Sequence, residues 1–271
     1  MNLSKQIKFT NFYKRMNILS LILIFFSVFI LFFKGLNLGV DFKGGTLIEI
    51  RVENSNINIS EIRNSLLKIS PGDVNVKKFG KENDFLAKIE VSNTNNTDFI
   101  KSIKNQLNKD LGSEVNFRRV ENVGPKVSGE LLKAGLIAIT LSLAAMLFYI
   151  WIRFEWQFSL GAIVAIIHDV IITVGIFSAL SYEINLSIVA AVLTIVGYSM
   201  NDTVVIFDRI RENLKKYTKI SISEISNVST NETLSRTIIT SVTTLLALFS
   251  IYIFGGSILK GFSFAMIVGV I

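Results

Sequence analysis

Long apolar segments are the feature of this sequence that most limits how it can fold. About 20 apolar residues in a helix cross the roughly 30 Å of hydrocarbon in a bilayer. Six segments are predominantly apolar, namely residues 16–33, 134–152, 158–180, 186–207, 234–254 and 258–271. The first five are long enough to span, whereas the last covers only about 21 Å at 1.5 Å per residue. We therefore expect a membrane protein with an all-α bundle of six transmembrane helices, the last one truncated.

Charge placement predicts the orientation of this bundle. The chain carries a formal net charge of +7, but its basic residues gather beside the apolar segments rather than in a stripe suited to nucleic acid. Residues 1–15 and 208–233 are rich in lysine and arginine, and the short loop 181–185 has neither. The positive-inside rule then places residues 1–15 and 208–233 in the cytoplasm, within a multi-pass protein of the cytoplasmic (inner) membrane, and residues 34–133 outside. No nucleic-acid partner is expected.

The segment outside the membrane has the pattern of a small α+β domain. Alternating residues predict strands over 46–52, 74–79, 85–91 and 115–120, and helical spacing predicts helices over 60–69, capped by Ser60, and 98–111. Pro71-Gly72 is expected to end the first helix. The order βαββαβ predicts a ferredoxin-like fold. The expected core contains Leu47, Ile62, Leu66, Ile89, Phe99 and Ile103.

Chemical function is not expected in this outer domain. It has no histidine, no carboxylate pair in a cleft pattern and no serine–histidine arrangement, and the whole chain lacks cysteine. The segment Asp41-Phe-Lys-Gly-Gly45 has the wrong spacing for a phosphate loop and is interpreted as a backbone turn. We expect no enzyme activity, no cofactor and no metal site.

A carboxylate within the fourth apolar segment is the first candidate functional residue. Asp202 lies inside residues 186–207, and an ionised carboxylate there costs at least about 2.5 kcal/mol. Tyr198 precedes it by one helical turn, with Asn201 and Thr203 adjoining, so this helix is expected to carry a polar stripe. The alternative is a carboxylate that only hydrogen-bonds a neighbouring helix.

The fifth apolar segment begins with a cation at matching depth. Arg236 is followed at helical spacing by Thr240. Asp202 and Arg236 both lie within roughly 8 Å of the expected inner boundary, at 1.5 Å per residue. We expect the two to pair in one conformation, so that Asp202 exchanges protons as its surroundings change. The arginine could instead extend to the lipid headgroups.

His168 and Asp169 lie near the middle of the third apolar segment. Adjacent helical positions point about 100° apart, so the two are not expected to face one partner. His168 is the only histidine of the chain, and histidine titrates near neutral pH. A proton relay and a structural hydrogen bond to a neighbouring helix both remain open for it.

Five separated motifs resemble the SecF branch of the SecD/SecF protein-export family. They are Gly39-Val-Asp-Phe-Lys-Gly-Gly-Thr46, Val123-Gly-Pro-Lys-Val-Ser-Gly-Glu130, Phe154-Glu-Trp-Gln-Phe-Ser-Leu-Gly161, the block from Val196 to Asn213, and Leu234-Ser-Arg-Thr-Ile-Ile-Thr-Ser241. The spacing matches over nearly the whole chain. A complete member continues its sixth helix past a glycine-rich motif, whereas this sequence stops at Ile271.

The resemblance implies partners and a role. It implies a complex with SecD that docks on the SecY/SecE/SecG channel, with YajC as a further partner, and that uses the proton gradient to draw unfolded polypeptide outward. It also ties residues matching Asp202 and Arg236 to proton flow. From their positions on these helices, we expect the other polar residues named above to support the path. Two alternatives are an exporter of small molecules of the resistance-nodulation-division type and a passive scaffold of the channel.

Overall fold

The computed structural model describes residues 7–53, 57–70, 74–79, 83–89, 96–154, 156–217 and 219–271. The chain divides into two compact units, one of Leu38–Ile137 and the other of Met1–Asn37 with Ala138–Ile271. The first six residues of the expected cytoplasmic N-terminus and the expected break at Pro71-Gly72 lie outside the described residues.

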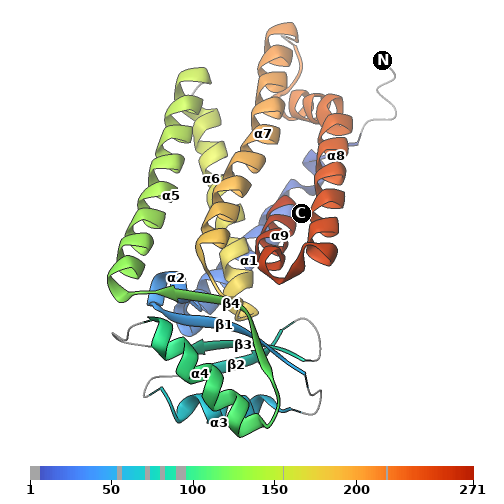
Figure 1. Cartoon of the computed structure of the whole chain (residues 1–271). Coiled ribbons are helices and arrows are strands. Elements are labelled where there is room, and N and C mark those ends of the chain that lie inside the picture. The colour runs from blue at the N-terminus through green and yellow to red at the C-terminus, as the bar shows by residue number, and fades with distance from the viewer. Residues whose placement is uncertain are drawn as a thin grey trace. The chain divides into compact units, whose positions relative to one another are not determined.

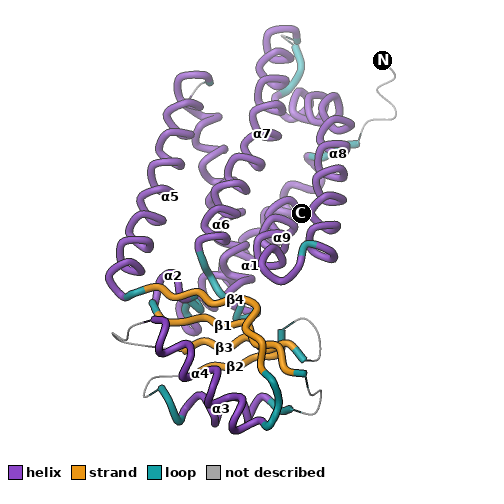
Figure 2. Tube along the Cα trace, in the orientation of Figure 1, coloured by secondary structure: helices purple, strands orange, loops and turns teal. Residues whose placement is uncertain are grey.

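The unit of Leu38–Ile137 holds a four-stranded antiparallel sheet with two helices. Figure 2 shows the strands side by side, in the order β2-β3-β1-β4, and each neighbouring pair is antiparallel. The elements follow the expected order along the chain. They are β1 (Gly45–Val52), α3 (Ile59–Leu67), β2 (Val74–Lys78), β3 (Asp84–Ile89), α4 (Asn96–Leu111) and β4 (Val115–Val123).

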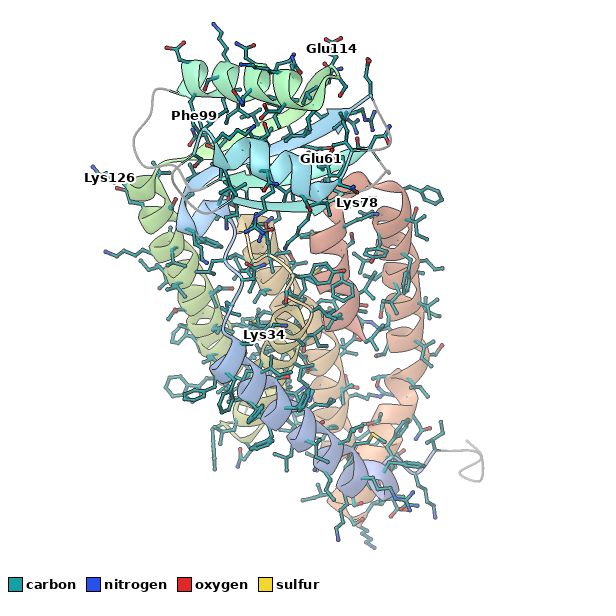
Figure 3. The ribbon with its side chains drawn as sticks, turned by 90° about the horizontal axis from the view of Figure 1, so that it is seen from below. Lys34, Glu61, Lys78, Phe99, Glu114 and Lys126 are labelled. Carbon is teal, nitrogen blue, oxygen red and sulfur yellow. The ribbon has the colours of Figure 1, made fainter. Side chains whose placement is uncertain are left out.

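One face of the sheet and the two helices enclose an apolar core. The helices contribute Ile62, Leu66, Ile103 and Leu107. The predicted core residue Phe99, labelled in Figure 3, packs at the edge of this core and is only partly buried.

The prediction that Leu47 belongs to this core is wrong. The buried residues of β1 are Ile48, Ile50 and Val52, and Leu47 points to the opposite, half-buried face. The strand does alternate, but in a pattern displaced by one residue, and such a displacement moves every side chain to the other face. The predicted N-cap of α3 is wrong as well: Asn58 occupies that position and makes no side-chain capping bond, so Ser60 lies inside the helix.

The double glycine before β1 has a conformational reason. A single helical turn, α2 (Val40–Lys43), ends at Gly44 and Gly45, whose φ angles are 78° and 118°. Residues with a Cβ rarely adopt these angles. The predicted backbone turn is thus a helical turn followed by two residues in conformations that favour glycine.

The unit of Met1–Asn37 with Ala138–Ile271 is built from long helices (Figure 1). By length and composition, five helices within the described residues can cross a membrane. Helix α1 packs against α6, α6 against α7 and α7 against α8, while α9 packs against both α7 and α8. The helices are α1 (Thr10–Lys34), α5 (Pro125–Arg153), which begins in the other unit, α6 (Trp156–Ala179), α7 (Leu186–Lys216), α8 (Ile222–Phe254) and α9 (Gly256–Val270).

Several helices extend beyond their apolar segments. Most of the predicted loop 208–233 is helical, because α7 continues to Lys216 and α8 begins at Ile222. The start of α8 carries a sequence signal that hydropathy does not reveal: Ser221 precedes Glu224 by three residues, and its hydroxyl accepts a hydrogen bond from the Glu224 backbone N–H at 3.3 Å. Ser-x-x-Glu is a capping-box pattern. Hydropathy marks the part of a helix suited to lipid, not the ends of the helix.

Candidate intramembrane polar site

Asp202 lies on α7 among residues that are only partly enclosed. Its side chain is half-buried, Asn201 is exposed, and Thr203 is half-buried with its hydroxyl donating to the Ser199 carbonyl at 3.0 Å. Such a bond within one helix satisfies the hydroxyl without a partner helix. Of the three adjoining polar residues, only Asp202 carries a charge on this turn of the helix.

Arg236 of α8 is close enough to Asp202 for their charges to interact. Both residues belong to the part of the chain that the structure describes, and no nitrogen of Arg236 lies within 4.0 Å of the Asp202 carboxylate. Arg236 itself is exposed. The predicted neighbours are therefore in electrostatic range but not in a salt bridge, an arrangement that a small movement of α8 relative to α7 can strengthen or weaken.

Two hydrogen-bonded links hold α7 against α8 on either side of this pair. On one side, Tyr198 donates to the hydroxyl of Ser241 at 3.4 Å. On the other, Arg209 Nε donates to Glu232 at 2.6 Å, and Asn213 donates to the same carboxylate at 2.8 Å. Because Asp202 and Arg236 both lie between these links along their helices, the α7–α8 hairpin brings them to a similar depth.

Thr240 does not join α7 and α8. Its hydroxyl donates back to the carbonyls of Arg236 and Thr237, at 3.1 and 3.0 Å. The polar residues predicted on α8 recur at helical spacing, but Thr240 hydrogen-bonds within α8 and not to α7.

His168 and Asp169 form a hydrogen-bonded pair on α6. His168 Nδ1 lies 2.8 Å from Asp169 Oδ1, whereas the angular argument predicts that adjacent residues face different partners. The free rotation of the two side chains lets them meet each other even though their Cβ atoms diverge. This contact lies within α6, so it is not the hydrogen bond to a neighbouring helix that is one of the two possibilities for His168. The proton relay stays a prediction.

Asp169 also connects α6 to α7, through a residue that sequence reasoning missed. The Ser199 hydroxyl donates to Asp169 Oδ2 at 2.6 Å. Ser199 precedes Asp202 by three positions, which places the two on neighbouring turns of one face. That spacing is visible in the sequence, but the partner on α6 is not. Among the residues that the structure describes, no group of three or more His, Cys, Asp or Glu side chains is placed to hold a metal ion.

Comparison with protein-family models gives two matches. Residues 103–271 match the C-terminal model of the protein export membrane proteins SecD/SecF. Residues 29–55 match the SecD/SecF GG motif, which includes the two glycines that follow α2.

The chain is also similar to named proteins and solved structures. It is 44% identical over 264 residues to the protein translocase subunit SecF of Rickettsia bellii, covering 97% of this chain and 87% of that protein. It is 45% identical over 247 residues to the subunit of that name from Ketogulonicigenium vulgare, covering 87% and 74% of the two chains. The crystal structure of SecDF, a translocon-associated membrane protein from Thermus thermophilus, superposes with a TM-score of 0.88 at 32% identity and covers 100% of this chain. The present chain spans only 37% of that longer protein.

Proposed function

This chain belongs to the SecD/SecF protein-export family, and on that premise we propose that it acts as a SecF subunit that couples the proton gradient to the export of unfolded polypeptide. Support comes from the 44% identity to a SecF subunit over nearly the whole chain. In this role the protein performs no covalent chemistry. The same identity favours polypeptide export over the small-molecule exporter.

The coupling residues we propose are Asp202 and Arg236. The observation that carries this assignment is a carboxylate on a membrane-spanning helix, within electrostatic range of an arginine on the next helix but not joined to it. A carboxylate away from water is more stable protonated, and one beside a cation is more stable ionised. Movement of α8 toward or away from α7 would therefore make Asp202 release or take up a proton.

The energy available is of the right size for such a switch. One elementary charge crossing 100 mV of membrane potential carries about 2.3 kcal/mol. Changing a carboxylate's proton affinity by two orders of magnitude takes about 2.7 kcal/mol, at about 1.4 kcal/mol for each factor of ten. Tyr198, Asn201, Thr203, Thr240, His168 and Asp169 are proposed to support the proton path around the pair.

Export from membranes with and without a proton gradient tests this assignment. Asp202→Asn keeps the size and hydrogen bonding of the side chain but cannot titrate, so the variant should assemble with its partners and lose gradient-dependent export. Asp208→Asn is the matched control, since Asp208 is a carboxylate of the same helix that pairs with Arg153 at 3.2 Å. If the assembled Asp202→Asn protein responds fully to the gradient, the passive-scaffold alternative is favoured instead.

We infer the partners and orientation on the same basis. SecD is the proposed membrane partner, because the chain superposes on part of a SecDF protein, and the SecY/SecE/SecG channel, YajC, the exported polypeptide and the lipid bilayer are proposed as further contacts. Residues 34–133 are proposed to lie outside the cytoplasmic membrane, and residues 1–15 and 208–233 inside it. We further propose that α9 belongs to a sixth membrane helix.

The chain has no cysteine, so single cysteines can report this orientation. An impermeant thiol reagent added from outside should label a cysteine placed at Asn83 and leave one at Lys216 unlabelled. The opposite labelling pattern contradicts the proposed topology.

We assign the unit of Leu38–Ile137 to the ferredoxin-like class. This assignment is supported by the βαββαβ order, by the sheet order β2-β3-β1-β4 and by the packing of both helices on one face.

A further inference from the structure

His168 combines an oriented ring with an unused nitrogen. Its Nδ1 is held at 2.8 Å from Asp169 Oδ1. Its other ring nitrogen, Nε2, is inaccessible from outside the protein and has no hydrogen-bond partner among the described residues. Buried polar atoms are nearly always paired, so an unpaired nitrogen on a membrane-spanning helix requires an explanation.

The chemistry of Asp169 determines which nitrogen carries the hydrogen. An ionised carboxylate only accepts hydrogen bonds. Asp169 accepts from Ser199 through Oδ2 at 2.6 Å, and its Oδ1 faces the imidazole. With Asp169 ionised, the neutral ring carries its hydrogen on Nδ1, which leaves the lone pair on Nε2 open as a proton acceptor.

Few other charges act on this imidazole. On α6 itself, His168 and Asp169 are the only ionisable residues. Of the helices packed against α6, α1 has no ionisable residue between Arg15 and Lys34, α5 has none between Lys133 and Tyr149, and α9 has only Lys260. On α7 the ionisable side chains nearest in sequence to Ser199 are Tyr198 and Asp202. The carboxylate in contact with His168, and able to stabilise a charged imidazolium directly, is therefore Asp169.

We propose that His168 is a second proton-binding site of this protein, with Nε2 as the accepting atom, Asp169 as the positioning carboxylate and Ser199 as the hydroxyl that orients it. A proton binds the Nε2 lone pair to give an imidazolium, and it leaves by the reverse step without any other bond being made or broken. Binding removes the net negative charge of the His168–Asp169 pair. Ser199, which bonds Asp169, and Asp202 lie on neighbouring turns of α7. The charge of the His168–Asp169 pair therefore acts electrostatically on the helix that carries Asp202, the proposed coupling carboxylate.

The single histidine makes the test direct. Protein labelled with ¹⁵N only in histidine gives one imidazole in its NMR spectrum, and this can be recorded in liposomes of phosphatidylethanolamine and phosphatidylglycerol without a gradient. Between about pH 8 and pH 5, where histidine changes charge, we expect the Nδ1–H tautomer at high pH and protonation of Nε2 as the pH falls. An Nε2–H tautomer, or a ring whose charge does not change in this range, would overturn the proposal.

Variants separate the proposed roles. Asp169→Asn should abolish the preference for one tautomer of His168, since an amide side chain can donate to Nδ1 as well as accept from it. Ser199→Ala should weaken this preference. An Asp169→Asn protein with an unchanged tautomer would show that the carboxylate has no positioning role.

This inference rests on the proposed function only for the use made of the proton, and the two can fail separately. Asp202→Asn should leave His168 able to titrate. If His168 titrates as expected while Asp202→Asn exports normally, the site stands and the coupling assignment falls. If Asp202→Asn loses gradient-dependent export while His168 never titrates, the coupling assignment stands and the second site falls.

Discussion

Gly175 of α6 lies directly against Ser27 of α1, so closely that a Cβ atom at Gly175 would overlap Ser27 Cβ and come within 2.9 Å of its Cα. Ser27 is almost completely buried at this contact. Small residues permit close approach of membrane helices, whose association depends on packing rather than on a hydrophobic driving force. The pair joins the first helix to the helix that carries His168 and Asp169.

Gly175→Ala should destabilise the helical unit. The methyl group meets backbone as well as side-chain atoms, and overpacking of this kind costs about 1–3 kcal/mol. Thermal unfolding of the purified protein in detergent should show a lower midpoint. Gly161→Ala in the same helix is the matched control, because its Cβ would find only an ordinary contact of 3.5 Å with Phe207. Equal midpoints for the two variants would contradict the close contact.

Residues 38–124 should fold alone, with a stability that depends on the face of β1. Ile48 is fully buried and Leu47 is half-buried on the opposite face. Ile48→Ala should cost about 2–5 kcal/mol of unfolding free energy, as for other buried isoleucines, and Leu47→Ala clearly less. Chemical denaturation of this fragment measures both. A larger loss for Leu47→Ala would mean that the strand alternates as the sequence pattern alone indicates.

Asp110 should make the stability of the unit of Leu38–Ile137 depend on pH in the acidic range. Hydrogen bonds donated by Lys68 and Gln106 lower the pKa of the Asp110 carboxyl to about 2 from its ordinary value of 3.8. Because the folded pKa lies below the unfolded one, the ionised carboxylate favours the folded state. This contribution is present above about pH 4, decreases as the pH falls toward 2, and is absent below it.

Carboxyl-carbon NMR of the fragment 38–124 measures this titration directly. The Asp110 signal should titrate near pH 2, and in Lys68→Met its midpoint should move up toward the ordinary value. A wild-type midpoint near 3.8 would show that the Lys68 contact, 2.9 Å in the structure, does not persist in solution.

Asn227 of α8 should protect the first turn of α1. The N-cap residue of α1, Phe9, has no side chain able to cap, and Asn227 Oδ1 instead accepts from the Thr10 backbone N–H at 3.0 Å. Loss of a helix cap typically costs about 1 kcal/mol. Asn227→Ala should therefore speed amide exchange at Thr10, while Ser223→Ala, at an exposed position of α8, should not. Unchanged exchange in Asn227→Ala would contradict capping between these helices.

Local patterns in the sequence were sufficient for the class of the protein and for most of its elements. Composition alone shows that an apolar segment is suited to a lipid bilayer. The alternation of apolar residues in strands and their spacing in helices can likewise be recognised within a few residues. The positions of Asp202 and Arg236 were equally visible, because a charge within an apolar segment needs no structural context to be noticed. Even so, these short-range patterns misplaced Leu47 by one residue, since neighbouring apolar positions of β1 differ little in composition.

Contacts between distant segments were decided only by the tertiary structure. The bond from Ser199 to Asp169, the cap from Asn227 to Thr10 and the close approach of Gly175 to Ser27 each depend on how one helix is rotated and shifted against another. Sequence spacing states which residues share a face of a helix, but not which partner that face meets. The unpaired Nε2 of His168 also depends on tertiary packing, because all the residues around a buried polar atom determine whether it finds a hydrogen-bond partner.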